Sequence, residues 1–248
     1  MQNPKSNPTA EKLIVFTQGG KGGVGKTTLA ACLLDYYAGN DVPTIALDLD
    51  TENKDRAGLA YFHPAAAKVN IDQRDGLDAF IDALDRDDAA VIVADMGARS
   101  GAPTFQWFEQ MFDAVREMGV RFTSIGVVTE DPGSVASVVE WAMKIQGRVS
   151  YLIVLNKLGD PNQSFRYWHD AKEAQQFRDV AKPEVITLDS INPDLQNAIR
   201  NHGLTIGQVA DGKATAPELS ASKFKIRAQQ IRRQLAAEFD RVSSLLLP

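Results

Sequence analysis

A glycine-rich stretch from residue 18 to residue 29, QGGKGGVGKTTL, constrains the fold of this chain more than any other feature. The apolar residues 13–17 before it are rich in β-branched and aromatic side chains, which is typical of a strand buried on both faces of a parallel sheet. Residues 28–37 after it are mostly good helix formers with apolar side chains at helical spacing. The expected order is therefore strand, glycine loop and helix.

Residues 20–27 fit the pattern GxxxxGK[ST] of a phosphate-binding loop. Its glycines let successive backbone N–H groups turn toward phosphate oxygens at the positive end of a helix. Lys26 would reach the β- and γ-phosphates, and the Thr27 hydroxyl would bind Mg²⁺. The residues expected to bind the nucleotide are Gly20, Gly22, Gly23, Val24, Gly25, Lys26, Thr27 and Thr28. The alternative is a glycine-rich turn that binds nothing, and the flanking strand and helix argue against it.

Apolar runs alternate with helical patterns along the rest of the chain. Further strands are expected at residues 44–49, 90–94, 122–129, 150–155 and 185–188. Further helices are expected at residues 76–84, 103–118, 132–145, 165–180, 194–202 and 220 to about 246. This alternation predicts right-handed crossovers and a three-layer α/β fold, with a mostly parallel sheet covered by helices on both faces. No repeat, low-complexity block or internal linker divides the sequence, so we expect one domain at 12–248 after a loose polar tail at 1–11.

Composition narrows the class of protein. A chain of 248 residues that is 44% hydrophobic can bury one large core. Its single Cys leaves no disulfide within the chain, the N-terminus has no signal-peptide pattern, and no apolar run approaches the ~20 residues that span a bilayer. We therefore expect a cytoplasmic protein. The net charge of −5 excludes a surface that is basic all over, so any contact with nucleic acid must come from a local patch.

Acidic residues end two of the expected strands, at the edge where parallel sheets bind their ligands. Asp48 and Asp50 end the second strand, and Asp95 ends the third after four apolar residues. Asp95 fits a Walker B carboxylate, and Asp48 would support the water shell of a Mg²⁺ ion held with Thr27. Asp50, one step further out, could orient the attacking water. The competing interpretation is that these acids cap helices or solvate loops.

The motif GKGGVGKTT, the DLD of residues 48–50 and the apolar strand that ends in Asp95 together resemble the deviant Walker A ATPases related to ParA and MinD, P-loop NTPases of the SIMIBI type. The resemblance implies ATP and Mg²⁺ as cofactors and a sandwich homodimer that forms on ATP. It also implies a catalytic role for Lys21, the additional lysine of the loop. Lys21 stands where the family's early lysine crosses the dimer and touches the phosphates bound by the other subunit. A solvated loop lysine is the alternative.

The same resemblance suggests which residues bind the base. Asn156 matches the family's adenine-reading asparagine, and residues 191–203, which include Pro193, resemble the loop and helix that flank the base. A guanine reader of the NKxD type is disfavoured because Asp160 stands one residue too late after Asn156 and Lys157.

Two departures from the family pattern bring this chain closer to one branch. ParA-like proteins continue the second strand with Asp-Pro-Gln, whereas Asp50 is followed by Thr51-Glu52-Asn53. The Walker B strand usually leads into Pro-Ala or Pro-Pro, whereas Asp95 is followed by Met96-Gly97-Ala98-Arg99-Ser100. These features are more similar to the plasmid stability and conjugal-transfer branch.

The C-terminal segment places apolar residues on one helical face, namely Phe224, Ala228, Ile231, Leu235, Phe239, Val242 and Leu246. One interpretation is that this face packs on the domain. A second is that basic residues of the segment contact DNA phosphates, namely Lys223, Lys225, Arg227, Arg232 and Arg233. The third, a membrane-surface helix, is disfavoured by Glu238 and Asp240.

The resulting hypothesis is a slow, partner-stimulated ATP hydrolase that dimerises on ATP and acts as a switch in plasmid partition, stability or conjugal transfer, with an unknown adaptor or stimulating protein. One alternative is an ATP-dependent small-molecule ligase or kinase of the same fold. Another is a nucleotide-gated scaffold that hydrolyses weakly. Family members that need several cysteines are excluded because Cys32 is alone, and His63, His169 and His202 occur in no metal-ligand spacing.

Overall fold

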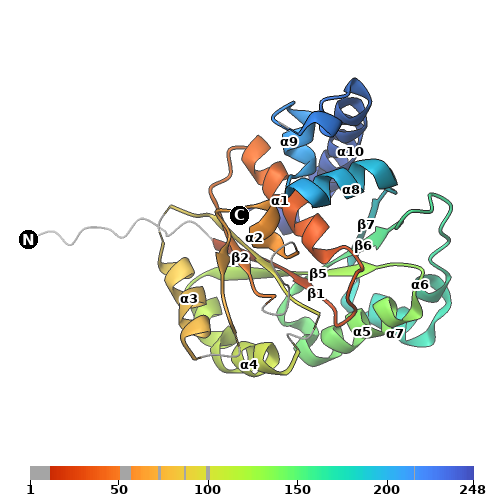
Figure 1. Ribbon diagram of the computed structural model, residues 1–248. Helices are drawn as coiled ribbons and strands as arrows, with labels where there is room; N and C mark the ends of the chain where they lie inside the picture. Colours follow the sequence, from red (N-terminus) through yellow and green to blue (C-terminus); the bar gives the residue numbers. More distant parts are fainter. Residues whose placement is uncertain (1–11, 51–56, 72–73, 87, 99–100, 215) are drawn as a thin grey trace, which may run out of the picture.

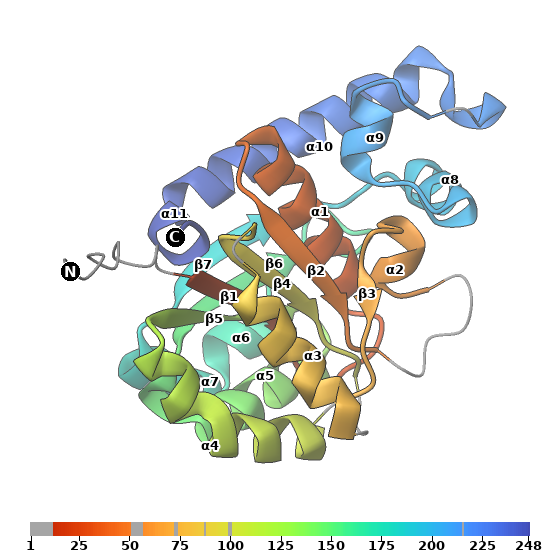
Figure 2. The same ribbon diagram turned by 90° about the vertical axis from the view of Figure 1, so that its left-hand side faces the viewer.

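A computed structural model describes residues 12–50, 57–71, 74–86, 88–98, 101–214 and 216–248. The tail predicted at 1–11, the Thr51-Glu52-Asn53 departure and Arg99 with Ser100 lie outside the described residues. A seven-stranded sheet forms the middle layer, with all its strand pairs parallel and the order β3-β2-β4-β1-β5-β6-β7. Helices α1, α8, α9 and α10 cover one face, and α3, α4, α5 and α7 cover the other (Figures 1 and 2). The three-layer α/β fold predicted from the sequence is confirmed.

The strands agree closely with the apolar runs in the sequence. They are β1 Lys12–Gln18, β2 Thr44–Asp48, β3 Ala67–Lys68, β4 Val91–Asp95, β5 Val120–Val128, β6 Ser150–Asn156 and β7 Glu184–Leu188. The edge strand β3 was not predicted, because its two residues are exposed and show no apolar pattern. In the central strand β1, Leu13 and Val15 face the core under α1 and α10, whereas Ile14 and Phe16 face the core over α4.

The helices are α1 Lys26–Gly39, α2 Leu59–Phe62, α3 Arg74–Asp85, α4 Gly101–Glu117, α5 Pro132–Ile145, α6 Arg166–Asp170, α7 Lys172–Ala181, α8 Pro193–His202, α9 Ile206–Ala210, α10 Ser222–Arg241 and α11 Ser243–Leu246. Short 3₁₀ turns follow α5 at Gln146–Arg148 and precede α10 at Pro217–Leu219. Helices α2 and α9 were not predicted.

Two predicted helices are each divided in the structure. The prediction of one helix at 165–180 is wrong, because Ala171 is extended (φ −67°, ψ 132°) and separates α6 from α7. The guanidinium of Arg178 on α7 donates hydrogen bonds to the carbonyl oxygens of Trp168 and His169, which satisfies the end of α6. The C-terminal helix likewise ends at Arg241, and α11 begins after Val242.

The apolar face of the C-terminal segment packs into the core, which confirms the first of its three interpretations. Phe224, Ala228, Leu235, Phe239, Val242 and Leu246 are buried, and Ile231 is partly buried against them. Polar contacts fix the same segment to α1, where Tyr36 Oη donates to Asp240 Oδ1 at 2.7 Å and Tyr37 Oη donates to the Leu246 carbonyl oxygen at 2.8 Å.

Helix α9 is built around a carboxylate from α1. Asp35 accepts hydrogen bonds from Thr205 Oγ1 at 2.9 Å and from the Gly207 backbone N–H at 2.8 Å. Thr205 and Gln208 also form a capping box at the start of the helix. These contacts bring Ile206 beside the carboxyl edge of the sheet, where it lines the cleft described below.

Candidate functional site

The glycine loop joins β1 to α1 at the carboxyl edge of the sheet. Gly23 and Gly25 adopt positive φ angles of 77° and 102°, a conformation that only glycine adopts readily. The Asn156 side chain, at the end of β6, donates a hydrogen bond from Nδ2 to the Val24 carbonyl oxygen at 2.8 Å. A Cβ atom on Gly25 would lie 2.4 Å from the same nitrogen. Gly25 is therefore required both for its backbone conformation and for the close approach of Asn156.

Lys26 is buried at the start of α1, inside the curve of the loop. Its Nζ donates a hydrogen bond to the Lys21 carbonyl oxygen at 2.9 Å. Burial lowers the pKa of Lys26, while the carboxylates of Asp95 and Asp50 act in the opposite direction. The loop thus encloses one ammonium group at the place where the sequence pattern expects the phosphates.

Asp95, at the end of β4, is buried and faces the loop. Its Oδ1 accepts a hydrogen bond from Thr17 Oγ1 at 2.8 Å. Burial raises the pKa of Asp95 to about 6, and hydrogen bonds from the Thr27 and Thr17 hydroxyls partly offset that effect. The structure therefore brings the predicted Walker B carboxylate together with the predicted Mg²⁺-binding hydroxyl of Thr27.

Asp48 stands opposite Asp95 in the register of β2 and β4. It accepts hydrogen bonds from the backbone N–H groups of Ala60 at 2.9 Å and Asp50 at 3.2 Å. Burial raises the pKa of Asp48, and these two N–H groups lower it. Asp48 is buried behind the wall of the cleft, whereas Asp50 is partly exposed and lines it. Asp48 therefore also holds the start of the segment that carries α2.

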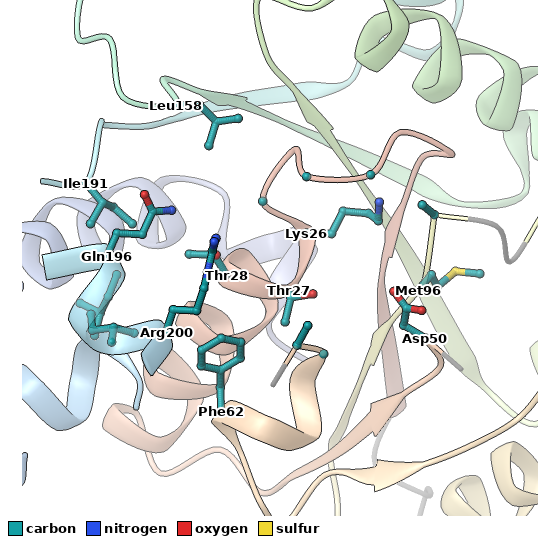
Figure 3. A pocket seen from close by; sticks show the side chains of 18 residues that line it. Lys26, Thr27, Thr28, Asp50, Phe62, Met96, Leu158, Ile191, Gln196 and Arg200 are labelled. Carbon is teal, nitrogen blue, oxygen red and sulfur yellow. The ribbon is translucent and has the colours of Figure 1, made fainter. Parts of the chain in front are cut away.

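A cleft of about 490 Å³ runs from the loop toward α8 (Figure 3). Figure 3 shows Lys26, Thr27, Asp50 and Met96 at one end and Ile191, Gln196, Arg200 and Phe62 at the other. The lining residues are Gly22, Gly23, Gly25, Lys26, Thr27, Thr28, Asp50, Ala57, Gly58, Phe62, Met96, Ala98, Leu158, Ile191, Gln196, Ile199, Arg200 and Ile206. One end presents Lys26, Thr27 and Asp50, and the other presents apolar side chains together with Gln196 and Arg200. The volume is that of a small-molecule site.

Several lining residues were not among the predicted site residues. Gln196, Ile199 and Arg200 lie in the segment expected to flank the base, but they were not named individually. Phe62 belongs to the four-residue helix α2, which has no clear periodic signal. A second hollow of about 350 Å³ lies between α5 and the helices α6 and α7, and it contains none of the predicted site residues.

Asn156 and Pro193 are not among the residues that line the 490 Å³ cleft. Asn156 is 4% exposed and supports the loop through Val24. Pro193 is exposed at the first position of α8, where the Asn192 side chain caps the helix by accepting from the Leu195 N–H at 3.2 Å. Direct contact of Asn156 and Pro193 with the base stays a prediction.

Lys21 forms an ion pair that the sequence analysis missed. Its Nζ lies 3.2 Å from Asp131 Oδ2, and both side chains are nearly half exposed. Asp131 is the N-cap of α5 and also accepts a hydrogen bond from the Gly133 N–H at 2.7 Å. Lys21 holds the pKa of Asp131 below its usual value. In this chain the second loop lysine is therefore bound to its own subunit.

The basic residues of α10 differ in their surroundings. Arg232 pairs with Asp211, so one of the five proposed phosphate contacts already has a carboxylate partner. The Lys223 ammonium lies over the Phe224 ring, 4.9 Å from its centroid. Lys223, Lys225 and Arg233 are exposed and Arg227 is partly exposed.

The described residues contain no group of three or more His, Cys, Asp or Glu side chains that could hold a metal ion. Among the helices described, none combines the length and the apolar character needed to cross a membrane.

Comparison with known proteins indicates the family to which this chain belongs. Residues 15–243 match the family model described as the CobQ/CobB/MinD/ParA nucleotide binding domain. The chain is 22% identical to Protein MobD of Acidithiobacillus ferrooxidans over 162 residues, which make up 65% of this chain and 70% of that protein.

Two solved structures from Aquifex aeolicus are also similar, each with 17% identity and a TM-score of 0.48. The MinD cell division protein is matched over 92% of this chain and 97% of its own, and the MinC:MinD cell division protein complex over 88% and 95%. Because the family model covers most of the sequence and the glycine loop lies within it, this protein belongs to the CobQ/CobB/MinD/ParA family of nucleotide-binding domains.

Proposed function

We propose that this protein is an ATPase that binds ATP in the 490 Å³ cleft, dimerises on it and thereby acts as a molecular switch. The observation that carries the proposal is the cleft, with the buried Lys26 ammonium inside the glycine loop at one end and apolar side chains beside Gln196 and Arg200 at the other. The loop would bind the triphosphate, and Leu158, Ile191 and Ile199 would contact the base.

The residues beside the loop fit Mg²⁺, a hard cation that prefers oxygen ligands and phosphates. Thr27 and Asp95 already contact each other, and Asp48 stands beside Asp95 in the sheet. These three residues would hold the ion or its waters, and the ion would supply charge neutralisation on the phosphates. Asp50, on the cleft wall near Lys26, would orient the attacking water.

Lys21 provides the link between nucleotide and dimer. Its pair with Asp131 is solvent-exposed, and exposed ion pairs contribute little stability. A triphosphate bound by a second subunit carries more negative charge than the Asp131 carboxylate, so it would attract the Lys21 ammonium more strongly. Dimerisation would therefore exchange the Asp131 carboxylate for phosphate oxygens.

The Lys21→Ala variant tests this role. It should retain nucleotide affinity at low protein concentration and lose the dimer at saturating ATP, measured by light scattering. Asp131→Asn is the matched control, because Asn also caps helix N-termini and α5 stays intact. Its ATP-dependent dimer should form at least as readily as that of the unchanged protein. Full dimerisation of Lys21→Ala at saturating ATP would contradict the sandwich and favour the ligase or kinase alternative.

The exposed basic side chains of α10 suggest DNA as a surface partner, in keeping with a role in plasmid partition, stability or conjugal transfer. Lys223, Lys225 and Arg233 have no carboxylate among the ion-pair partners that the described residues show. Replacing Lys223 and Arg233 by Glu should abolish binding to non-specific duplex DNA and leave ATP binding unchanged. Binding of the unchanged protein to anionic vesicles, and not to DNA, would favour the membrane interpretation instead.

A further inference from the structure

Just beyond the paired ends of β2 and β4, Gly97 lies against Asp50. Strands β2 and β4 pair up to Asp48 and Asp95, and the Leu49 N–H donates one more hydrogen bond to the Asp95 carbonyl oxygen at 2.9 Å. Asp50 then packs directly against Gly97. A Cβ atom on Gly97 would lie 2.7 Å from Asp50 Cγ, 2.9 Å from Oδ1 and 3.1 Å from Cα.

The requirement for glycine at this position comes from Asp50 and not from the backbone. Gly97 is buried, and its φ angle is outside the positive range that favours glycine. Any residue could therefore adopt its backbone conformation, but none could place a side chain there without moving Asp50. The two closest atoms belong to the Asp50 carboxylate, so an added methyl group would force that carboxylate to rotate away, whereas the Asp50 Cα at 3.1 Å would need only a small shift.

We propose that Gly97 is a positioning residue for Asp50. Its bare Cα forms the surface against which the Asp50 carboxylate rests, on the wall of the cleft beside Met96 and Lys26 (Figure 3). The inference rests on the proposed function in one respect, since it assumes that the Asp50 carboxylate orients water. It also gives a physical reason for Gly97 in the Met96-Gly97-Ala98 sequence that follows the Walker B strand.

The Gly97→Ala variant of the full chain tests the inference. A displaced carboxylate should lower kcat for ATP roughly 10- to 100-fold, because small errors in the position of a catalytic group have effects of that size. Affinity for a fluorescent ATP analogue should change little, because the three atoms nearest to an added Cβ all belong to Asp50 and none to the glycine loop. The matched control is Gly147→Ala, which adds the same methyl group where a Cβ meets no atom within 4 Å.

A double-mutant cycle with Asp50→Ala separates positioning from general damage. Asp50→Ala removes Cγ and Oδ1, the two atoms closest to the added methyl group. Gly97→Ala should therefore cause no further fall in kcat, and little fall in Tm, when Asp50 is already Ala. If Gly97→Ala alone does not fold, the double variant should fold.

Two results would overturn the inference: unchanged kcat and Tm in Gly97→Ala, or losses of equal size with and without the Asp50 carboxylate. An Asp50→Ala variant that hydrolyses ATP at the normal rate would refute the proposed role of Asp50 in catalysis. In that case the difference between the fall in Tm caused by Gly97→Ala with Asp50 present and the fall caused with Asp50→Ala decides whether Gly97 positions Asp50.

Discussion

Asn156 is the residue for which the sequence and the structure suggest different roles, and Asn156→Ala separates them. The resemblance to ParA and MinD predicts that Asn156 reads adenine. In the structure its Nδ2 donates a buried hydrogen bond to the Val24 carbonyl oxygen at 2.8 Å and supports the phosphate loop. Removing the side chain leaves that carbonyl without this partner in a buried site.

The effect of Asn156→Ala on stability follows from the loss of this buried hydrogen bond. Loss of one partner of a buried hydrogen bond costs about 1–3 kcal/mol, so urea unfolding should show a free energy of unfolding that is lower by that amount. The free loop can relax, and nucleotide binding must then restore its shape. Affinity should therefore fall by up to about 5- to 150-fold, at 1.4 kcal/mol for each factor of ten.

The assay compares ATP, GTP and inorganic triphosphate. Loop support predicts that Asn156→Ala weakens all three by a similar factor, because the defect lies at the phosphates. Asn162→Ala is the control, since Asn162 is exposed and does not line the cleft. A selective loss of ATP affinity, with triphosphate binding and unfolding free energy unchanged, would refute the loop-support reasoning and establish base reading.

Three further predictions follow from single contacts. Lys26→Ala should abolish binding of a fluorescent ATP analogue, because it removes the ammonium group inside the loop; unchanged affinity would mean that the loop is not a phosphate site. Asp50→Ala should bind ATP, turn it over far more slowly and prolong the dimer, and a normal hydrolysis rate would assign the water to another residue. Lys157 and Gln234 hold the pKa of Asp189 below its usual 3.8, so its contribution to stability is present above that pH and is lost as the pH falls through the lower folded value. Asp189→Asn should therefore lower Tm at neutral pH, and the difference from the unchanged protein should disappear in acid.

The parts of the site that the sequence predicted are those with a local signal. Glycine spacing predicts the phosphate loop, and an apolar run followed by an acid predicts the roles of Asp95 and Asp48. These residues are adjacent to strands whose periodicity is clear, and parallel strands place their carboxyl ends along one edge of the sheet. The structure accordingly brings Thr27 and Asp95 together.

The parts that the sequence did not predict depend on contacts between distant segments. The hydrogen bond from Asn156 to Val24 joins residues that are 132 positions apart in the sequence. It forms because β6 ends at Asn156, beside the glycine loop. Phe62 reaches the cleft on a helix of only four residues, too short for a periodic pattern. The ion pair of Lys21 with Asp131 could not be predicted either. The sequence Asp131-Pro132 at the start of α5 predicts a helix N-cap, but it does not indicate an ion pair.

The two loop lysines are connected through a single residue, and this connection decides how Lys21 variants are read. Lys26 Nζ donates to the backbone carbonyl oxygen of Lys21, whereas the Lys21 side chain pairs with Asp131. Substitution of Lys21 by Ala removes the ammonium group and keeps the carbonyl, so the partner of Lys26 in the free loop is preserved. A loss of dimerisation in Lys21→Ala can therefore be assigned to the missing ammonium group. Damage to the Lys26 site would instead appear as weaker nucleotide binding at low protein concentration.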